Sequence, residues 1–156
     1  MSDSKRELIV ENMVTQLGTI SVAGGYNFDI SALDIYERLL TFDELGQIRL
    51  PCLTVTMGTE NATVVLMGSV PKYRGSFPVF VQGFIKSEDK QTIRRMAERM
   101  LRDVRKLIFV DMTRGGYAHT QKLTSIKTDE GMLAYEGYGV FEIELEIVYD
   151  YLADAP

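Results

Sequence analysis

The sequence has little of the chemistry that most catalytic and metal sites use. Its 156 residues include one cysteine, Cys52, one histidine, His119, and no tryptophan. A single cysteine cannot form an internal disulfide, and this pair cannot supply the three or four thiolate and imidazole ligands of a zinc site. A nucleophilic dyad of the two would need a third group to orient it, and the sequence indicates none. We therefore expect no metal, no cofactor and no catalytic residue.

Long apolar segments are also missing. The longest, residues 77–81 and 107–110, are much shorter than the roughly 20 residues that a membrane-spanning helix needs. Residues 1–7 contain no apolar stretch of the kind that a signal peptide has. We therefore expect a chain that stays in a reducing compartment, or in a particle assembled there, without membrane contact.

Phosphate-binding glycine patterns are absent too. Glycine pairs occur at residues 24–25 and 115–116, but neither matches a P-loop or a dinucleotide fingerprint. The acidic pairs at residues 43–44 and 129–130 lie in turn-like contexts, where carboxylates commonly bond to the local backbone. Both features indicate turns and no active site.

The composition is that of an ordinary folded domain. Hydrophobic residues make up 46% and charged residues 25% of the chain, which argues against disorder. A chain of this length can bury a sizeable core as one unit. We expect a single domain spanning residues 1–156.

Two segments have the apolar spacing of amphipathic helices. The first, residues 4–17, begins with a capping box in which Ser4 and Glu7 can satisfy each other's backbone donors. The second follows Ser87, which we expect as its N-cap, and runs to residue 108. The apolar positions are Ile9, Met13, Leu17 and Ile20 in the first, and Ile93, Met96, Ala97, Met100, Leu101, Val104, Leu107 and Ile108 in the second.

Strand patterns occupy much of the remaining chain. Residues 140–151 alternate apolar and mostly acidic side chains, which predicts a strand with one buried and one acidic face. Residues 32–40 fit either a strand or a helix, and the alternation of Leu33, Ile35 and Leu39 favours a strand. The other expected elements are strands at residues 52–56, 62–67, 78–85 and 123–128, a turn at 41–46 and a hairpin tip at 71–76. This order predicts an α+β fold, a mostly antiparallel sheet with two amphipathic helices packed against it.

Opposite charges gather on different elements. The net charge is −5, yet residues 90–106 carry seven of the 17 basic residues, while residues 129–156 carry eight of the 22 acidic residues and no basic one. Such segregation concerns surfaces and partners more than fold. The candidate interface residues are Arg95, Arg99, Arg102 and Lys106 on the second helix, and Glu142, Glu144 and Glu146 on the last strand.

Each charged set has a simpler interpretation. The basic stripe suits a plain solvated helix face, because Glu98 can pair with Arg102 and no aromatic residues interleave. A pI near 4.9 also argues against a dedicated nucleic-acid binder. The acidic ladder suits a solvated strand face, although three carboxylates so close together could share a hard cation with another acidic surface.

Our hypothesis is that the two charged sets meet between copies of the chain. Complementary patches on different faces of one molecule produce head-to-tail contacts, which close into rings when the rotation permits. The stripe at Arg95, Arg99 and Arg102 would then contact the glutamates of a neighbour. Two alternatives stay open, namely pairing of the two sets within one chain, and a ladder that lines the inner wall of a ring.

Several landmarks occur in an order that resembles a known family. The first landmarks are the helix start at residues 6–13 and the segment Gly-Tyr-Asn-Phe-Asp-Ile at residues 25–30. Phe-Asp-Glu-Leu at residues 42–45 and Leu-Pro-Cys-Leu-Thr-Val at residues 50–55 come next. The long second helix follows, and the closing strand ends at residues 147–149. In this order they resemble the tail-terminator, or tail-completion, proteins of long-tailed bacteriophages. Residues 57–77 have no counterpart in that resemblance.

The resemblance implies a virion protein assembled in the bacterial cytoplasm. It implies a sheet flanked by helices, a homo-oligomeric ring, typically of six copies, and a role in capping the tail tube before head joining. The implied partners are other copies, the tail tube protein and head or neck connector proteins, and genomic DNA would pass the ring without specific binding. The family has no catalytic residues to carry over.

Two other functions remain open. A head–tail connector or another minor tail or neck protein would bind heads before tail tubes. A small ligand-binding or regulatory α+β domain would be a monomer or dimer with an apolar pocket. The mass in solution separates a ring from the second of these.

Overall fold

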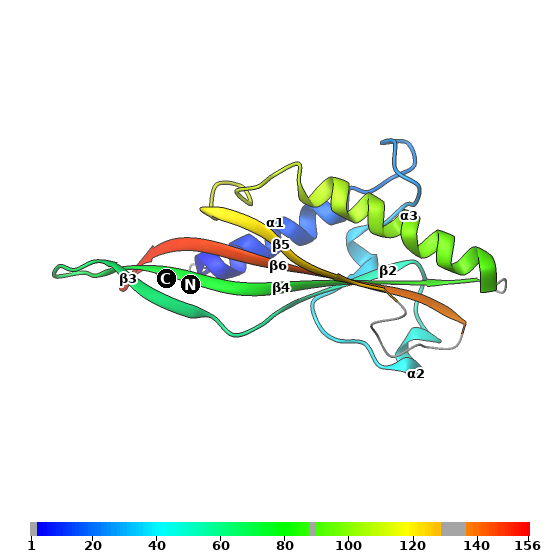
Figure 1. Ribbon diagram of the computed structural model, residues 1–156, viewed down its shortest axis with the longest axis horizontal. Coiled ribbons are helices and arrows are strands. Elements are labelled where there is room, and N and C mark those ends of the chain that lie inside the picture. Colours follow the sequence, from blue (N-terminus) through cyan, green and yellow to red (C-terminus); the bar gives the residue numbers. More distant parts are fainter. Residues whose placement is uncertain (1–2, 88–89, 129–136) are drawn as a thin grey trace.

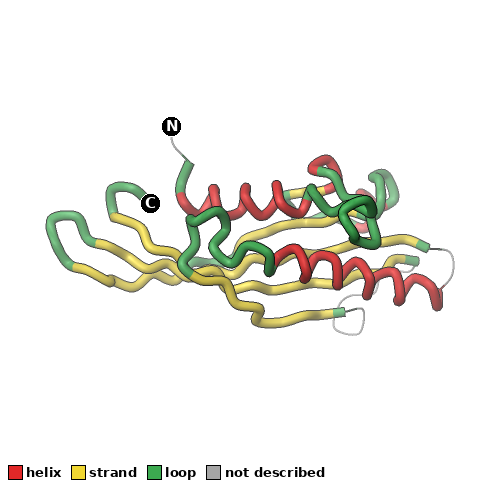
Figure 2. Tube along the Cα trace, turned by 90° about the horizontal axis from the view of Figure 1, so that it is seen from above, coloured by secondary structure: helices red, strands yellow, loops and turns green. Residues whose placement is uncertain are grey.

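A computed structural model describes residues 3–87, 90–128 and 137–156, and within them a twisted sheet carries two long helices on one face (Figure 1). Figure 2 shows both helices lying lengthwise over the strands. The elements in chain order are α1 (Lys5–Leu17), the 3-10 turn η1 (Ala32–Asp34), β1 (Ile35–Tyr36), α2 (Phe42–Leu45), β2 (Cys52–Met57), β3 (Asn61–Leu66), β4 (Lys72–Lys86), α3 (Lys90–Ile108), β5 (Thr120–Lys127) and β6 (Tyr138–Leu152).

The sheet is built around one long strand pair. Strands β4 and β6 are each 15 residues long and pair antiparallel over their whole length, from Lys72 opposite Leu152 to Lys86 opposite Tyr138. The strand order is β1-β2-β4-β6-β5, and β3 pairs with β4 on the same side as β2. Only the two-residue pairing of β1 with β2 is parallel among the described strands. The α+β prediction is therefore confirmed.

The first helix begins where the sequence predicts. The Ser4 side chain accepts from the backbone of Glu7, and the Glu7 carboxylate accepts from the Ser4 backbone N–H at 2.9 Å, which completes the capping box. Its face at Ile9, Met13 and Leu17 is fully buried. The capping interaction and this apolar stripe together explain why the helix forms and how it is oriented.

The main core lies between the two helices and the sheet. Met100 and Val104 of α3 are fully buried in one cluster with Ile143 and Leu145 of β6. Burying each such side chain contributes roughly 1.5–3 kcal/mol before the entropy cost. The alternation predicted for residues 140–151 is confirmed, because the odd-numbered residues of β6 from 141 to 149 are buried in this core.

A glycine lets the two central strands accommodate a large ring. Gly83 of β4 lies opposite Phe141 of β6, and a Cβ added at Gly83 would come within 2.2 Å of the Phe141 ring. Phe141 is 1% exposed and belongs to the main core. The close approach therefore requires glycine at this position.

A second, smaller core covers part of the opposite face. Leu40, Leu45 and Cys52 pack there with Phe84 and Val140, beneath the segment that contains α2. Even-numbered residues of β4 and β6 supply this cluster because successive side chains of a strand point to opposite faces. Among the described elements, no helix covers the remainder of that face, which we refer to as the open face (Figure 1).

Three local predictions were wrong. Residues 32–40 form a 3-10 turn and a two-residue strand, because the Asp34 carboxylate accepts from the Ser31 backbone N–H at 2.9 Å and closes a turn. Residues 41–46, predicted as a turn, contain the one-turn helix α2, which Thr41 caps. The tip predicted at residues 71–76 lies mostly inside β4, because β3 and β6 pair with that stretch from both sides.

The remaining elements agree closely with the predictions. Strand β2 covers residues 52–56, β3 covers most of 62–67, and β5 covers most of 123–128 while starting three residues earlier. Helix α3 is present, but its predicted N-cap, Ser87, adjoins residues 88–89, which lie outside the described residues, so that cap stays a prediction. The acidic pair at residues 129–130 also lies outside them. In the described parts of the chain, no helix is long and apolar enough to cross a membrane.

Candidate interaction surfaces

The basic stripe of α3 faces away from the sheet. Arg95, Arg99 and Arg102 are exposed, and none of them has a hydrogen bond or ion pair with another residue in the described ranges. The expected pair of Glu98 with Arg102 is not formed there. Lys106 differs from the arginines, because its ammonium lies 4.8 Å from the centre of the Tyr26 ring. Three of the four predicted cations are therefore available to a partner.

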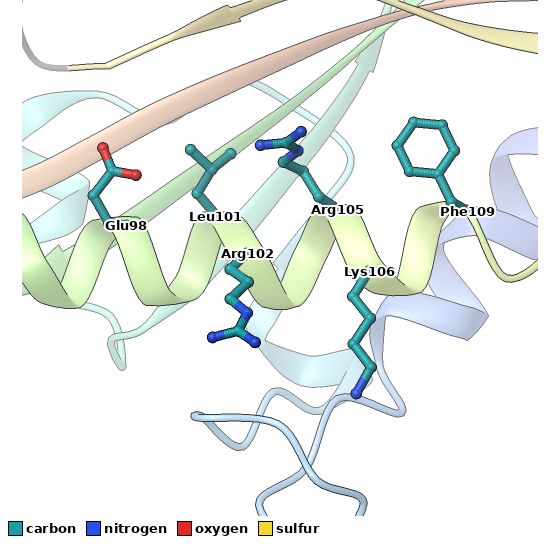
Figure 3. A pocket seen from close by; sticks show the side chains of 6 residues that line it. All are labelled: Glu98, Leu101, Arg102, Arg105, Lys106 and Phe109. Atoms are coloured by element: carbon teal, nitrogen blue, oxygen red, sulfur yellow. The ribbon is translucent and has the colours of Figure 1, made fainter.

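An open groove runs along this helix (Figure 3). Glu98, Leu101, Arg105 and Phe109 follow one side, while Arg102 and Lys106 extend from the other side of the helix (Figure 3). The groove thus combines three cations and one carboxylate with two apolar side chains.

The acidic residue Asp103 has a structural role beside the stripe. It is 3% exposed, and its carboxylate accepts from the Asn27 backbone N–H and side-chain amide, both at 2.7 Å. These bonds hold the glycine-containing loop around residues 21–28 against α3. Asp103 therefore adds no charge to the exposed surface beside the stripe.

The three glutamates of the acidic ladder lie on the open face. Each accepts a hydrogen bond from a side chain of a neighbouring strand: Glu142 from Gln82 at 2.7 Å, Glu144 from Ser125 at 3.1 Å, and Glu146 from Ser76 at 2.7 Å. Glu142 also lies 3.6 Å from the Lys127 ammonium. The ladder is therefore largely satisfied inside its own sheet.

Cations from other strands balance the ladder. At the end of β6, the Arg74 guanidinium donates two hydrogen bonds to Asp150, at 2.7 and 3.0 Å, and Lys72 lies 3.5 Å away. The hydrogen bond from Arg74 is the main cause that lowers the pKa of Asp150 to about 2. Lys122 lies opposite Glu146 in the strand register, and so shares its face. The acidic residues Glu142, Glu144, Glu146 and Asp150 thus share the face with the basic residues Lys72, Arg74, Lys86, Lys122 and Lys127.

The stripe and the ladder belong to opposite faces of the sheet. Helix α3 packs on the side where Phe141, Ile143 and Leu145 are buried, and the glutamates between them point the other way. Pairing of the two sets within one chain is therefore excluded by the fold. A head-to-tail contact between copies remains compatible with it.

Cys52 and His119 do not form a dyad. Cys52 lies in β2 and His119 comes just before β5. Strands β4 and β6 lie between β2 and β5, so the two residues lie toward opposite edges of the sheet. Burial, together with the charge of Asp34, raises the pKa of Cys52 to about 12, so its thiol stays protonated. Across the described residues, no three Asp, Glu, His or Cys side chains are grouped to hold a metal ion.

One buried cation serves the fold. Arg114 is fully buried, and its guanidinium donates to the backbone oxygens of Ile108 and Asp111 and to the Gln16 side chain at 2.8 Å. Burial lowers its pKa. Because Ile108 is the last residue of α3, this arrangement satisfies the carboxyl end of that helix and fixes it to α1.

The most exposed apolar feature was not among the candidates from the sequence. We define the arm as residues 61–71, which comprise β3 and the turn leading into β4. Its first ten residues are all exposed, and the arm contains no charged residue. The large apolar side chains and their exposed fractions are Val64 49%, Val65 46%, Leu66 64%, Met67 75% and Val70 39%.

The arm projects beyond the rest of the molecule. It forms the far tip at the β3 end, away from α3 (Figure 1). In the described sheet β3 pairs only with β4, so its outer edge keeps unpaired backbone groups. A continuous apolar strand normally indicates a buried strand, and the sequence alone did not show that the other strands leave this one uncovered.

A second apolar surface lies on the open face. Leu39 and Phe80 line a shallow groove there, and Leu39 is 65% exposed. Met57 borders the groove at the end of β2, but its side chain lies on the helix-covered face, where its sulfur accepts from Arg6 of α1 at 3.3 Å. Thr56, Gln82 and Glu142 complete its lining. We refer to this feature as the apolar groove.

Comparisons with known proteins give a likeness of fold only. No family model matches the sequence, and no curated protein matches it. Among solved structures, a chain of the virion of the native gene transfer agent (GTA) particle is similar, with 9% sequence identity and a TM-score of 0.47. The match covers 89% of this chain and 92% of that chain. At this level the likeness does not by itself indicate a function.

Proposed function

We propose that this protein is a structural assembly subunit of a phage-like virion, a tail terminator that forms a ring on the end of the tail tube and joins it to the head. The ordered landmarks in the sequence suggest the family. The observation that carries the assembly role is the exposed arm, because an uncharged apolar hairpin in water indicates a surface made for a protein partner.

The energetics of the arm support this role. Its five large apolar side chains are between 39% and 75% exposed, whereas most apolar residues of β2, β4 and β6 are buried. Complete burial of one such side chain contributes roughly 1.5–3 kcal/mol, so covering five half-exposed ones is worth several kcal/mol gross. The unpaired edge of β3 would also aggregate if nothing covered it. A partner resolves both problems.

The charged surfaces offer a second candidate contact. Arg95, Arg99 and Arg102 have no partner among the described residues, so the predicted contact with the glutamate ladder of a neighbouring copy stays a proposal. The internal hydrogen bonds of the ladder disfavour it, because the glutamates would have to exchange good partners for new ones. A ladder that lines the inner wall, where it would repel passing DNA, is the competing role for those residues.

The mass of the purified protein in solution tests the ring. Light scattering over a range of concentrations, and then in the presence of tail tubes, should show a closed species of several copies. Electron microscopy should place that species at the tube end. A species that stays single-copy with and without tubes would contradict the proposal, and binding to heads before tubes would indicate a neck protein instead.

Charge reversal tests the second contact separately. Changing Arg95, Arg99 and Arg102 to Glu should dissociate the ring if the stripe is an interface, and changing Glu142, Glu144 and Glu146 to Lys in the same chain should restore it. A ring that survives the first change excludes the stripe as an interface. A ring that keeps its mass but alters DNA passage after the second change supports the inner-wall role.

A further inference from the structure

We infer that the arm of one copy docks in the apolar groove of a second copy of this chain. This contact rests on the proposed ring, and specifies which surfaces hold neighbouring subunits together. The donor is the arm, residues 61–71, and the acceptor is the groove that Leu39 and Phe80 line on the open face.

The arm has the properties of a donor that a protein surface can accept without electrostatic cost. It has no charged residue, so docking strips water from no ion. Its largest exposed side chains, Leu66 and Met67, lie at the end of β3 and at the turn. Pairing with β4 keeps the arm extended beyond the helices, which limits the entropy lost when it docks.

The groove has the matching properties of an acceptor. Leu39 is 65% exposed, and Phe80 lies beside it. The one charged residue of its lining, Glu142, already accepts from Gln82 at 2.7 Å and lies 3.6 Å from Lys127. An apolar occupant therefore covers the groove without leaving a carboxylate unpaired.

The geometry of β4 directs the arm to another copy. The arm joins β4 at Lys72, while Phe80 in the groove lies eight residues further along the same strand. At about 3.4 Å per residue in an antiparallel strand, the tip of the arm, where Leu66 pairs with Lys72, lies roughly 27 Å from Phe80, and its base, where Asn61 pairs with Ser76, lies roughly 14 Å from it. The arm points away from the groove. The chain cannot fill its own groove. Two different surfaces of one chain that fit each other produce a head-to-tail contact, which is the kind that closes a ring.

Complementing variants provide the experiment. Leu66→Lys places a charge on the arm and leaves the groove intact, whereas Leu39→Lys places a charge in the groove and leaves the arm intact. Both positions are exposed, so each variant should fold, which its thermal unfolding will verify. Val22→Lys is the matched control, because Val22 is 56% exposed and lies in neither surface.

The masses expected by light scattering at one high concentration follow directly. The unchanged chain and Val22→Lys form the ring. For Leu66→Lys alone and for Leu39→Lys alone, the fraction of chains in the ring is at least tenfold lower. Their mixture forms a species of two copies and nothing larger, because only one working arm and one working groove remain for each pair.

Each other outcome overturns something definite. If either single variant still forms the full ring, or if the mixture stays single-copy, the arm and groove are not the contact, although the ring stands. If Val22→Lys dissociates the ring as well, any added surface charge has that effect and the inference fails. If the unchanged chain is single-copy both with and without tail tubes, the proposed function fails first.

Discussion

The two ends of the β4–β6 pair differ in how much of their surface the rest of the chain covers. At one end Phe84 and Val140 are buried in the small core, while the main core covers the other face. At the other end Tyr73 stacks on Tyr151, with ring centres 5.7 Å apart, and the arm continues past the helices. One strand pair therefore supplies both the stable centre of the fold and a projecting surface. Stability and assembly are separated along its length.

The arm and the acidic ladder show what identifies a partner surface. The ladder is conspicuous in the sequence, yet its glutamates find partners on β4 and β5. The arm is uncharged and inconspicuous, yet its large apolar side chains stay 39% to 75% exposed within the described chain. Unmet packing indicates a partner more reliably than charge does, because a charged group in water is already well solvated.

Replacing a core residue near the covered end should have the largest effect. Phe141→Ala should lower the free energy of unfolding by about 3–5 kcal/mol, because a large ring at 1% exposure would leave a cavity beside Gly83. Chemical denaturation measures the change. Phe109→Ala is the matched control, since Phe109 is 40% exposed, and it should cost less than about 1 kcal/mol. Equal losses would mean that the main core is not where stability resides.

Removing one ladder residue should have a smaller effect on stability. Glu142→Ala leaves the Gln82 amide without its acceptor and should cost roughly 1–2 kcal/mol in denaturant unfolding. Glu142→Gln keeps an acceptor and loses only the half-exposed pair with Lys127, so it should cost under about 1 kcal/mol. Glu142 also lines the apolar groove, so the ring mass is checked at Glu146, which accepts from Ser76 outside that groove. Glu146→Gln should leave the ring mass unchanged, and dissociation of the ring by it would make the ladder, and not the arm, the contact.

The base of the arm should show a pH-dependent contribution at low pH only. The folded pKa of Asp150, about 2, is below its ordinary 3.8, so the carboxylate stabilises the fold above pH 3.8 and this contribution is lost as the pH falls through 2. Carboxyl NMR titration should therefore place its midpoint near 2. Arg74→Gln should raise the midpoint toward 3.8, because the two hydrogen bonds from Arg74 are lost. A midpoint unmoved by this change would remove Arg74 as the cause.

A charge on the arm should have the smallest effect on stability. Val65→Lys should change the free energy of unfolding by less than about 0.5 kcal/mol, because Val65 is 46% exposed and contributes little to the core. Denaturant unfolding at a concentration where the chain is single-copy checks this. A loss of several kcal/mol would show that the arm packs on its own chain and is no free surface.

Local rules and periodicity were sufficient for much of the fold. The capping box at Ser4 and Glu7, the apolar stripe of α3 and the alternation of β6 each depend on residues close together in the chain. The strand predicted at residues 32–40 was mostly wrong because the Asp34 side chain closes a local turn that competes with the alternating pattern. The hairpin tip predicted at residues 71–76 was wrong because strands β3 and β6 pair with this segment on both sides and keep it extended, despite its turn-forming residues.

The candidate site divides in the same way. The sequence by itself determined the two helices, the long closing strand, the lack of a thiolate or imidazole metal set, and which residues carry the charges. Only the tertiary structure decided that Lys127, Ser125 and Ser76 satisfy the ladder, and that nothing described in the chain covers the arm. The physical reason is that helix and strand periodicity are local properties, whereas exposure and electrostatic balance depend on which distant strands become neighbours.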